Sequence, residues 1–384
     1  MYALDLCGEF SFPNHIVFGP GRVSELADRV RPWGSQALVV TDEGIHGSGI
    51  LGRVLEVLRD GNIDYRTFDG VEPNPSGDSV EAGVRRLEGC DFIISVGGGS
   101  VIDAGKAIRL RATHEGPLEQ YDDLIGGSSL IRDDMPPMVA IPTTAGTGSE
   151  VGRSTVITLG GRKTVIFSPA LIPTMALCDP ALTLDMPRRV TAGTGADALT
   201  HNIEAYYARG FHPLCDAIAV DGMRRAMRSL PVAMEEPRDL GARSDMMVAA
   251  MMGAIAFQKG LGVVHSLSHP LSTIAGVHHG TANALMLPHA LRFNREFIAD
   301  RSSVVADALG VPAAPNPLET VERIAIALEH LFQAIGLPAR LRDVGVQSAL
   351  VCRMADLAME DGCHLTNPRP VTRQDMVALY EAAL

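Results

Sequence analysis

Four histidines gather in one short stretch of the chain. The segment "GVVHSLSHPLSTIAGVHHG" contains His265, His269, His278 and His279, whereas the whole chain has 12 histidines. Imidazole binds metal ions through a neutral ring nitrogen, and it exchanges protons near neutral pH. His265 and His269 are four residues apart, so on a helix they share one face. The stretch is therefore a candidate for metal binding, for proton transfer, or for both.

A second pair of metal-binding residue types lies upstream. The segment "GADALTHNIEAY" places Asp197 and His201 four residues apart, again on one helical face. Alone, such a pair is more often a surface pair than a set of ligands. With the histidine cluster, however, one carboxylate and several imidazoles make a donor set that suits Fe²⁺ or Zn²⁺. The spacing leaves open which three histidines bind.

A glycine-rich turn suggests a phosphate site. The segment "DFIISVGGGSVIDAGKAIRLRA" predicts a buried strand, a glycine turn and a helix. Backbone N–H groups and the helix dipole favour an anion there, and glycine lets it approach closely. A plain tight turn is the alternative. Ser100, Asp103 and Lys106 fall on the first turns of the helix, where capping and solvated charge are the ordinary roles.

Two more polar segments follow predicted strands. Asp42 comes directly after "ALVVT", where a carboxylate binds ribose hydroxyls and repels a 2′-phosphate, so NAD is favoured over NADP. A turn or cap aspartate is the alternative. The segment "IPTTAGTGSE" follows a strand ending near Ile141, and a flexible loop is its ordinary interpretation. Its hydroxyl-bearing residues are Thr143, Thr144, Thr147 and Ser149. Two such loops in one half of the chain favour a nucleotide pocket.

The predicted secondary structure differs between the two halves of the chain. Up to about residue 185, strand-like runs alternate with helical patterns, which predicts a largely parallel sheet with helices on both faces. The segment "STVITLGGRKTVIFS" predicts a hairpin turning at Gly160–Gly161. From about Pro187 to Leu384 helical periodicity dominates. We therefore expect an α/β domain over residues 1–185 and an all-helical domain over residues 186–384.

Composition narrows the class of protein. The chain has 384 residues, 46% of them hydrophobic, and a net charge of -12, which argues against nucleic acid or an anionic membrane as an obligatory partner. The start, "MYALDLCGEF", lacks the pattern of a signal peptide. The longest apolar run, "MMVAAMMGAIAF", is shorter than the ~18 residues of a membrane span, and we expect a buried helix there. The six cysteines, Cys7 among them, form no C-x-x-C pair and fit a reducing cytoplasm.

Taken in order, these motifs resemble the iron-containing, or group III, alcohol dehydrogenases. The likeness covers nearly the whole chain and rests on "FGPG", "EPNP", "GGGSVIDAGKA", "IPTTAGTGSE", "DALTHNIEAY", the "VHSLSHPL…HHGTANALMLPH" block and "NPRPVTRQDMVALY". It implies a dehydroquinate synthase-like fold: an α/β nucleotide-binding domain with a mostly parallel sheet, followed by an all-α metal-binding domain. It also implies a homodimer.

The resemblance assigns roles to single residues. It implies that Fe²⁺ or Zn²⁺ is bound by Asp197, His201, His265 and His279. It makes His269 the candidate for proton transfer beside the substrate and leaves His278 with a structural or pocket-lining role. The contacts that it implies for NAD are Asp42, Asn74, Gly98, Gly99, Ser100, Thr143, Thr144 and Thr147, with Ser149 and Lys163 as further candidates.

The implied activity is a metal-dependent, NAD(H)-linked alcohol dehydrogenase or aldehyde reductase, which transfers hydride between nicotinamide and a small primary alcohol or aldehyde. One departure concerns the substrate: "SEVGRSTVIT" has Gly152-Arg153 where many relatives have threonine and a smaller or uncharged residue. An arginine there would hold a carboxylate or phosphonate. The alternative function is therefore a dehydrogenase for an anionic hydroxy acid or semialdehyde, similar to 4-hydroxybutyrate. A solvated or interdomain charge is the ordinary role of Arg153.

Other functions are less favoured. An NAD-dependent cyclase of the dehydroquinate synthase-like superfamily would have a different metal set and lysine-rich phosphate sites. Metal-independent relatives, such as maleylacetate reductases, and a non-catalytic binding protein are disfavoured by the complete ligand set. The resemblance also brings Cys363 and His364 of "DGCHLTNPRP" near the substrate, although a buried cysteine and a surface histidine are the ordinary interpretation.

Overall fold

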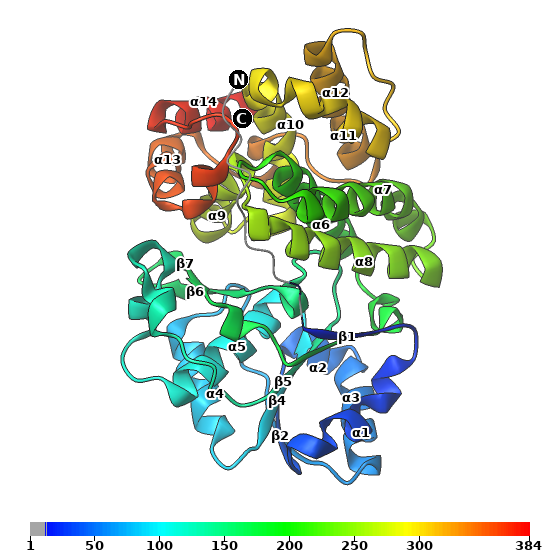
Figure 1. Cartoon of the computed structure of the whole chain (residues 1–384), viewed down its shortest axis with the longest axis vertical. Helices are drawn as coiled ribbons and strands as arrows, with labels where there is room; N and C mark the ends of the chain where they lie inside the picture. The colour runs from blue at the N-terminus through cyan, green and yellow to red at the C-terminus, as the bar shows by residue number, and fades with distance from the viewer. Residues whose placement is uncertain (1–11, 13) are drawn as a thin grey trace. The chain divides into compact units, whose positions relative to one another are not determined.

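The first half of the chain alternates strands and helices, as its pattern predicts (Figure 1). The computed structural model describes residue 12 and residues 14–384. The strands of this half are β1 (His15–Phe18), β2 (Gln36–Val40), β3 (Asp64–Phe68), β4 (Phe92–Gly97), β5 (Met138–Pro142), β6 (Ser154–Leu159), β7 (Arg162–Phe167) and β8 (Met175–Cys178). The helices are α1 (Leu26–Val30), α2 (Glu43–Gly47), α3 (Ile50–Asp60), α4 (Gly77–Leu87) and α5 (Gly99–Thr113).

Six of the strands form one parallel sheet. Within the described residues their order is β1-β8-β5-β4-β2-β3, and every neighbouring pair is parallel. The chain passes from β2 to its neighbour β3, returns to β4 on the other side of β2, and continues to β5. The strand order therefore reverses between β2 and β4. In open α/β sheets, ligands bind outside the carboxyl ends of the strands at such a point.

Apolar side chains cover both faces of this sheet. On one face Leu26 of α1 and Val54 of α3 belong to the core, and on the other face Val80 of α4 and Ile108 of α5 do. Because both faces are covered, β4 is buried at every position. The separate hairpin of β6 and β7 turns at Gly160–Gly161, as predicted, and both glycines have a positive φ.

From residue 187 onward the described chain forms helices and no strand. The helices are α6 (Arg188–Tyr207), α7 (Pro213–Glu235), α8 (Leu240–Ala256), α9 (Val263–Ala275), α10 (His279–Ile298), α11 (Ser302–Ala308), α12 (Pro317–Ala334), α13 (Val351–Glu360) and α14 (Arg373–Ala383), with the short 3-10 helix η13 (Gly362–Thr366) before α14. The predicted combination of a mostly parallel α/β part and an all-α part is confirmed.

The helix α8 is unusually apolar along its length. Among the described residues, Leu240–Lys259 is the segment long and apolar enough to cross a membrane, and 56% of its most apolar 18 residues are buried inside the protein. Met246, Met247 and Ala250 are among the buried residues of α8. This agrees with the buried Met/Ala-rich helix that the sequence predicts.

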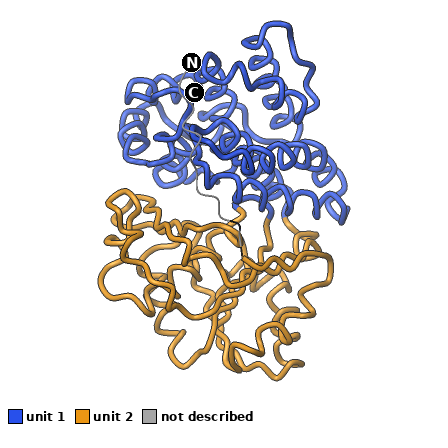
Figure 2. The backbone as a smooth tube through the Cα atoms, viewed as in Figure 1, with its two compact units in different colours: residues 1–12, 145–147, 187–384 blue, residues 13–144, 148–186 orange. Residues whose placement is uncertain are grey.

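The described chain divides into two compact units (Figure 2). Of the described residues, the α/β unit comprises 14–144 and Gly148–Met186, and the helical unit comprises Phe12, Ala145–Thr147 and Pro187–Leu384. Ala145–Thr147 belongs to the helical unit although α/β segments flank it on both sides. A Cβ atom on Gly146 would lie 2.8 Å from the Cβ of Thr194 in α6, so only glycine allows this close approach.

Candidate metal and nucleotide sites

Three helices supply the predicted metal ligands. Asp197 and His201 lie one turn apart on α6, His265 lies in the first turn of α9, and His279 is the first residue of α10. The donor atoms of Asp197, His265 and His279 all lie within 4.8 Å of one another. His201 lies beside them: its ring stacks on that of His265 with 4.5 Å between centroids. The structure therefore brings all four predicted ligands together.

The chemistry of this group fits a divalent cation. Within the described residues, buried His201 Nδ1 has no hydrogen-bond partner, and it lies 3.7 Å from Asp197 Oδ1. An unpaired buried polar atom is costly. Burial lowers the pKa of His201 to about 4, so the imidazole is neutral near pH 7 and its lone pair is available to a metal. One carboxylate with neutral imidazoles is a set that both Fe²⁺ and Zn²⁺ accept.

Glu204 is a functional residue that the sequence interpretation missed. Its Oε2 accepts a hydrogen bond from His265 Nδ1 at 2.6 Å, and its Oε1 accepts one from the backbone N–H of Val264 at 2.8 Å. Since a carboxylate only accepts, His265 donates through Nδ1 and presents Nε2 to the metal group. Burial acts to lower the pKa of His265, but the hydrogen bond and charge of Glu204 outweigh it and raise the net pKa.

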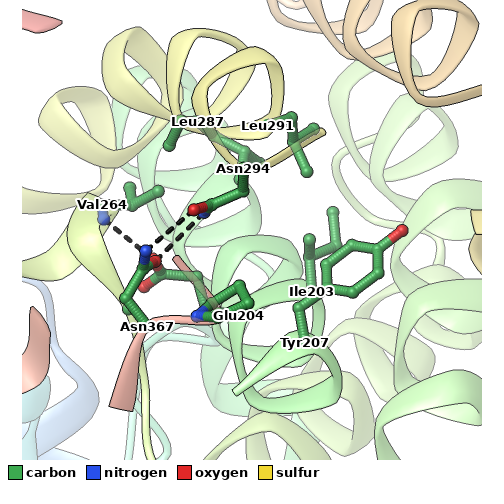
Figure 3. Close-up of a pocket in the computed structure, with 11 residues that line it drawn as sticks. Ile203, Glu204, Tyr207, Val264, Leu287, Leu291, Asn294 and Asn367 are labelled. Carbon is green, nitrogen blue, oxygen red and sulfur yellow. Dashed lines mark hydrogen bonds between the residues drawn. The ribbon is translucent and has the colours of Figure 1, made fainter. Parts of the chain in front are cut away.

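A pair of amides completes this support (Figure 3). Asn367 Oδ1 accepts from the backbone N–H of Val263 at 3.2 Å. Asn367 and Asn294 also exchange two hydrogen bonds, at 2.8 and 3.0 Å. With Glu204 they line a small pocket. Because the N-cap of α9 is Gly262, which has no side chain, these groups satisfy the first N–H groups of the helix. The first turn of α9, and His265 with it, is thereby fixed.

Asn283 is a second residue that the sequence interpretation missed. It lies one turn after His279 on α10, and its Nδ2 donates to Asp197 Oδ1 at 2.7 Å. The same nitrogen is 3.4 Å from Nε2 of both His265 and His279. Gly280 allows α10 to approach α6 this closely, because a Cβ atom there would lie 1.9 Å from the carbonyl oxygen of Gly193. Asn283 therefore orients the Asp197 carboxylate.

The two remaining histidines of the cluster differ from each other. His269 lies one turn after His265, and its ring stacks on that of His279 with 5.3 Å between centroids. This places the proton-transfer candidate against the metal group. His278 is exposed and lies beside α6, where a Cβ atom on Gly193 would come within 2.7 Å of its Nδ1. Within the described residues, His278 is outside the group of converging donors.

The interpretation of His364 as a surface histidine is wrong. Its side chain is buried, its backbone N–H donates to Ser266 Oγ at 2.9 Å, and its ring nitrogen Nδ1 bonds to the carbonyl oxygen of Asp361. The contact with Ser266 holds η13 against α9. Cys363 is half-buried, and burial raises the pKa of its thiol well above the usual range.

In the α/β unit, three segments that carry predicted nucleotide contacts lie at the carboxyl edge of the sheet. Asp42 follows β2, the start of α5 at Gly98–Ser100 follows β4, and Thr143–Thr144 follows β5. These strands are neighbours, and a Cβ atom on Gly98 would lie 3.3 Å from Thr144 Oγ1. Asp42 also caps α2 by accepting from the Ile45 N–H, so the cap role that was the alternative is observed. The edge includes the point where the strand order reverses.

Asn74 and Lys163 are brought near each other by the hairpin. Asn74 has a φ of 62°, a left-handed conformation that asparagine tolerates. Its carbonyl oxygen is 3.4 Å from Thr158 Oγ1, and Thr158 pairs directly with Lys163 across β6 and β7. Thr147 belongs to the helical unit. All of these cofactor contacts stay predictions.

Asp103 and Lys106 are buried, so the interpretation of both as solvated charges is wrong. Lys106 Nζ donates to Ser149 Oγ at 2.9 Å and to the carbonyl oxygens of Gly152 and Ser154 at 3.0 and 2.8 Å. Ser149 Oγ in turn donates to Asp103 Oδ1. The Ser149 hydroxyl is thus engaged inside the unit. Burial lowers the pKa of Lys106 to about 8 against the opposing effect of Asp103.

Similarity to known proteins identifies the family. Residues 13–180 match the family described as iron-containing alcohol dehydrogenase, and residues 191–384 match the C-terminal part of the Fe-containing alcohol dehydrogenase family. The chain belongs to the iron-containing alcohol dehydrogenase family. It is therefore an oxidoreductase of alcohols and aldehydes, and the cyclase, metal-independent reductase and binding-protein alternatives are disfavoured.

Individual members of this family align along almost their whole length. The chain is 40% identical to a 4-hydroxybutyrate dehydrogenase of Cupriavidus necator, over 96% of this chain and 98% of that protein. A solved 1,3-propanediol oxidoreductase superposes with a TM-score of 0.93 at 37% identity, covering 98% and 100% of the two chains. A sulfoacetaldehyde reductase from Bifidobacterium kashiwanohense, solved with NAD+, superposes with a TM-score of 0.87 at 28% identity, covering 98% of each chain.

Proposed function

We propose that this enzyme interconverts small primary alcohols and their aldehydes with NAD(H), at an Fe²⁺ or Zn²⁺ ion. The observation that carries the proposal is the convergence of the Asp197, His265 and His279 donor atoms within 4.8 Å of one another, with buried His201 beside them. In this proposal residues 1–185 bind the dinucleotide and residues 186–384 bind the metal and carry out catalysis.

The residues of the helical unit have distinct roles in the proposed reaction. A bound cation supplies Lewis acidity, which polarises the substrate oxygen. Asp197, His201, His265 and His279 hold the ion. His269 takes up the proton that the alcohol releases on oxidation, and it returns the proton when the aldehyde is reduced. The stacking of His269 on His279 supports this role because it places the ring next to the metal group.

The residues of the α/β unit bind and orient the cofactor in this proposal. NAD(H) accepts or supplies the hydride. The N–H groups of Gly98–Ser100 at the start of α5 bind its phosphates, and Asp42 binds its ribose hydroxyls and disfavours NADP. The reversal of strand order between β2 and β4, beside these residues, supports the assignment.

The location and assembly expected from the sequence belong to the same proposal. We place the enzyme in the cytoplasm as a homodimer. None of the described cysteines is in a disulfide, which fits a reducing compartment; they are Cys90, Cys178, Cys215, Cys352 and Cys363. Cys7 lies outside the described residues.

An assay of NADH oxidation tests the proposed reaction. The protein is reconstituted with Fe²⁺ without oxygen and supplied with short neutral aldehydes and, separately, with semialdehydes that carry a carboxylate. We expect turnover with at least one group, NADH to be preferred over NADPH, and activity to disappear on chelation and return with metal. The absence of turnover with both groups would contradict the proposal, and turnover in the chelated protein would remove the metal from it.

A second candidate function is the oxidation of an anionic hydroxy acid. The 40% identity to a 4-hydroxybutyrate dehydrogenase favours it, as does Arg153. The guanidinium of Arg153 lies 5.0 Å from the centre of the Phe167 ring. A cation–π contact of this kind orients the planar guanidinium, and a guanidinium can pair with a carboxylate through two N–H groups.

Replacement of Arg153 by alanine separates the two candidate functions. If Arg153 binds the substrate carboxylate, the KM for a carboxylate-bearing semialdehyde should rise about ten- to hundred-fold, since a charge-assisted hydrogen bond contributes about 1.5–3 kcal/mol. The KM for a neutral aldehyde should stay unchanged. Arg132→Ala, which removes an exposed arginine paired with Asp134, is the matched control. Equal kinetics of both variants would eliminate Arg153 as the specificity residue.

A further inference from the structure

A second carboxylate–histidine pair lies beside the metal group. His269 Nδ1 is 2.6 Å from Asp361 Oδ2, and both side chains are largely buried, with 12% and 8% of their surfaces exposed. The two residues are 92 positions apart in the chain, so the contact comes from packing of the α13–η13 turn against α9. It resembles the Glu204–His265 pair, except that His269 is not among the predicted ligands.

The hydrogen bonds of Asp361 fix which oxygen faces the histidine. Its Oδ1 accepts from Ser266 Oγ at 2.7 Å and from the backbone N–H of Cys363 at 2.8 Å. An aspartate is ionised near neutral pH, and both of these donors give their hydrogens to Oδ1. Asp361 is therefore a carboxylate with Oδ2 turned to His269.

This arrangement determines the tautomer of His269. A carboxylate accepts and never donates, so the hydrogen of the pair is on His269 Nδ1. In the neutral ring, Nε2 then carries the lone pair. Donor atoms of His269, Asp361 and Cys363 lie within 4.8 Å of one another, but the His269–Asp361 distance is that of a hydrogen bond and not of two ligands of one ion. Two donors on one tetrahedral ion lie roughly 3.3 Å apart, farther than the observed 2.6 Å.

We propose that Asp361 is a positioning residue for His269, which holds Nδ1 protonated and the ring oriented so that Nε2 receives and returns the proton of the substrate. The inference rests on the proposed function of His269. Asp361 is also the N-cap of η13. One carboxylate therefore both caps this short helix and orients His269.

Replacement of Asp361 by asparagine reverses the direction of the hydrogen bond with His269 and keeps the shape of the side chain. The N–H of Cys363 requires an oxygen at the Oδ1 position, so the new amide places its NH₂ group at the Oδ2 position. That group donates to His269 Nδ1, which must then give up its hydrogen. We expect His269 to change from the Nδ1–H to the Nε2–H tautomer, and kcat to fall about 10²- to 10⁴-fold with bound metal and NADH affinity unchanged.

Two measurements test the proposal. The first is a two-bond ¹H–¹⁵N correlation spectrum of Zn²⁺-loaded protein with ¹⁵N-labelled histidine, in which the His269 signals are those lost in His269→Ala. An Nε2–H pattern in the unaltered protein would overturn the proposal, even if the asparagine variant failed to fold. This spectrum does not depend on turnover, so an enzyme inactive on every alcohol and aldehyde would refute the proposed function and leave the tautomer decided.

The second measurement is a double-mutant cycle. In a His269→Ala background, Asp361→Asn should lower kcat less than three-fold further, because the residue that it positions is already gone. An undiminished loss in that background would show that Asp361 acts by another route. Asp356→Asn, which breaks an exposed ion pair between α13 and α14, is the matched control and should change neither kcat nor the spectrum.

Discussion

Replacing Asp197 with asparagine should remove most of the bound metal and lower turnover by about 10³-fold or more. The variant keeps the shape of the side chain and an oxygen for Asn283 Nδ2, so the helices should remain packed. It loses the negative charge that a cation needs among neutral imidazoles. Polarisation by a metal is worth several kcal/mol of barrier, and each 1.36 kcal/mol corresponds to a factor of ten. Metal per chain, measured after dialysis, and kcat should fall together.

Two further variants provide a control and an intermediate case for comparison with Asp197→Asn. Asp307→Asn removes an exposed carboxylate of the same unit, paired with Arg224, and should retain both metal and activity. Glu204→Gln leaves the ligands in place but weakens the orientation of His265, and it should lower metal affinity about ten- to hundred-fold. If Asp197→Asn turned over at the normal rate without metal, the Lewis-acid role would be wrong.

Replacing Lys106 with methionine should destabilise the α/β unit by about 3–5 kcal/mol, since removing one member of a buried charge group leaves the others uncompensated. Asp103 and Glu150 would lose their neighbouring cation. Burial already raises the pKa of Glu150 to about 7, and the charge of Lys106 opposes this effect. The carbonyl oxygens of Gly152 and Ser154 would lose a donor as well. Urea unfolding of the two proteins measures the difference.

The same helix offers a control for Lys106. Arg111 is on α5 too, but its ion pair with Glu81 is partly exposed, and Arg111→Met should change the free energy of unfolding by less than about 1 kcal/mol. Combining Lys106→Met with Asp103→Asn should recover part of the loss, because the carboxylate no longer needs a partner. Equal stability of Lys106→Met and Arg111→Met would show that the buried network contributes little.

Much of the fold follows from local pattern. The glycine pair at Gly160–Gly161 between alternating residues predicts the β6–β7 hairpin, and helical spacing predicts α3 and α4. The sequence pattern does not predict the strand β8. It has four residues, all buried, and a run so short shows neither the alternation of a half-exposed strand nor the length of a helix. Only its pairing with β1 and β5 makes it a strand.

Some residues of the candidate site can likewise be predicted from local spacing in the sequence, and others cannot. Glu204 was visible in principle, because in "DALTHNIE" it falls seven positions after Asp197 on the same helical face. Asp361 was not, because nothing in the spacing relates it to His269, far earlier in the chain. Lys106 was misinterpreted for a similar reason. Its partners come from a loop more than forty positions later, and a lysine near a helix start is ordinarily solvated.

The position of the segment Ala145–Thr147 bears on the order in which parts of the protein fold during synthesis. It is translated within the α/β region, yet it belongs to the helical unit, and Gly146 packs on Thr194 of α6. While the ribosome is still synthesising the α/β region, α6 has not yet been made, so the tip of the "TTAGTGS" loop lacks the helix on which it packs. We therefore expect a nascent chain arrested before α6 to lack the contact between Gly146 and Thr194, so that this loop takes its final position only after α6 has emerged.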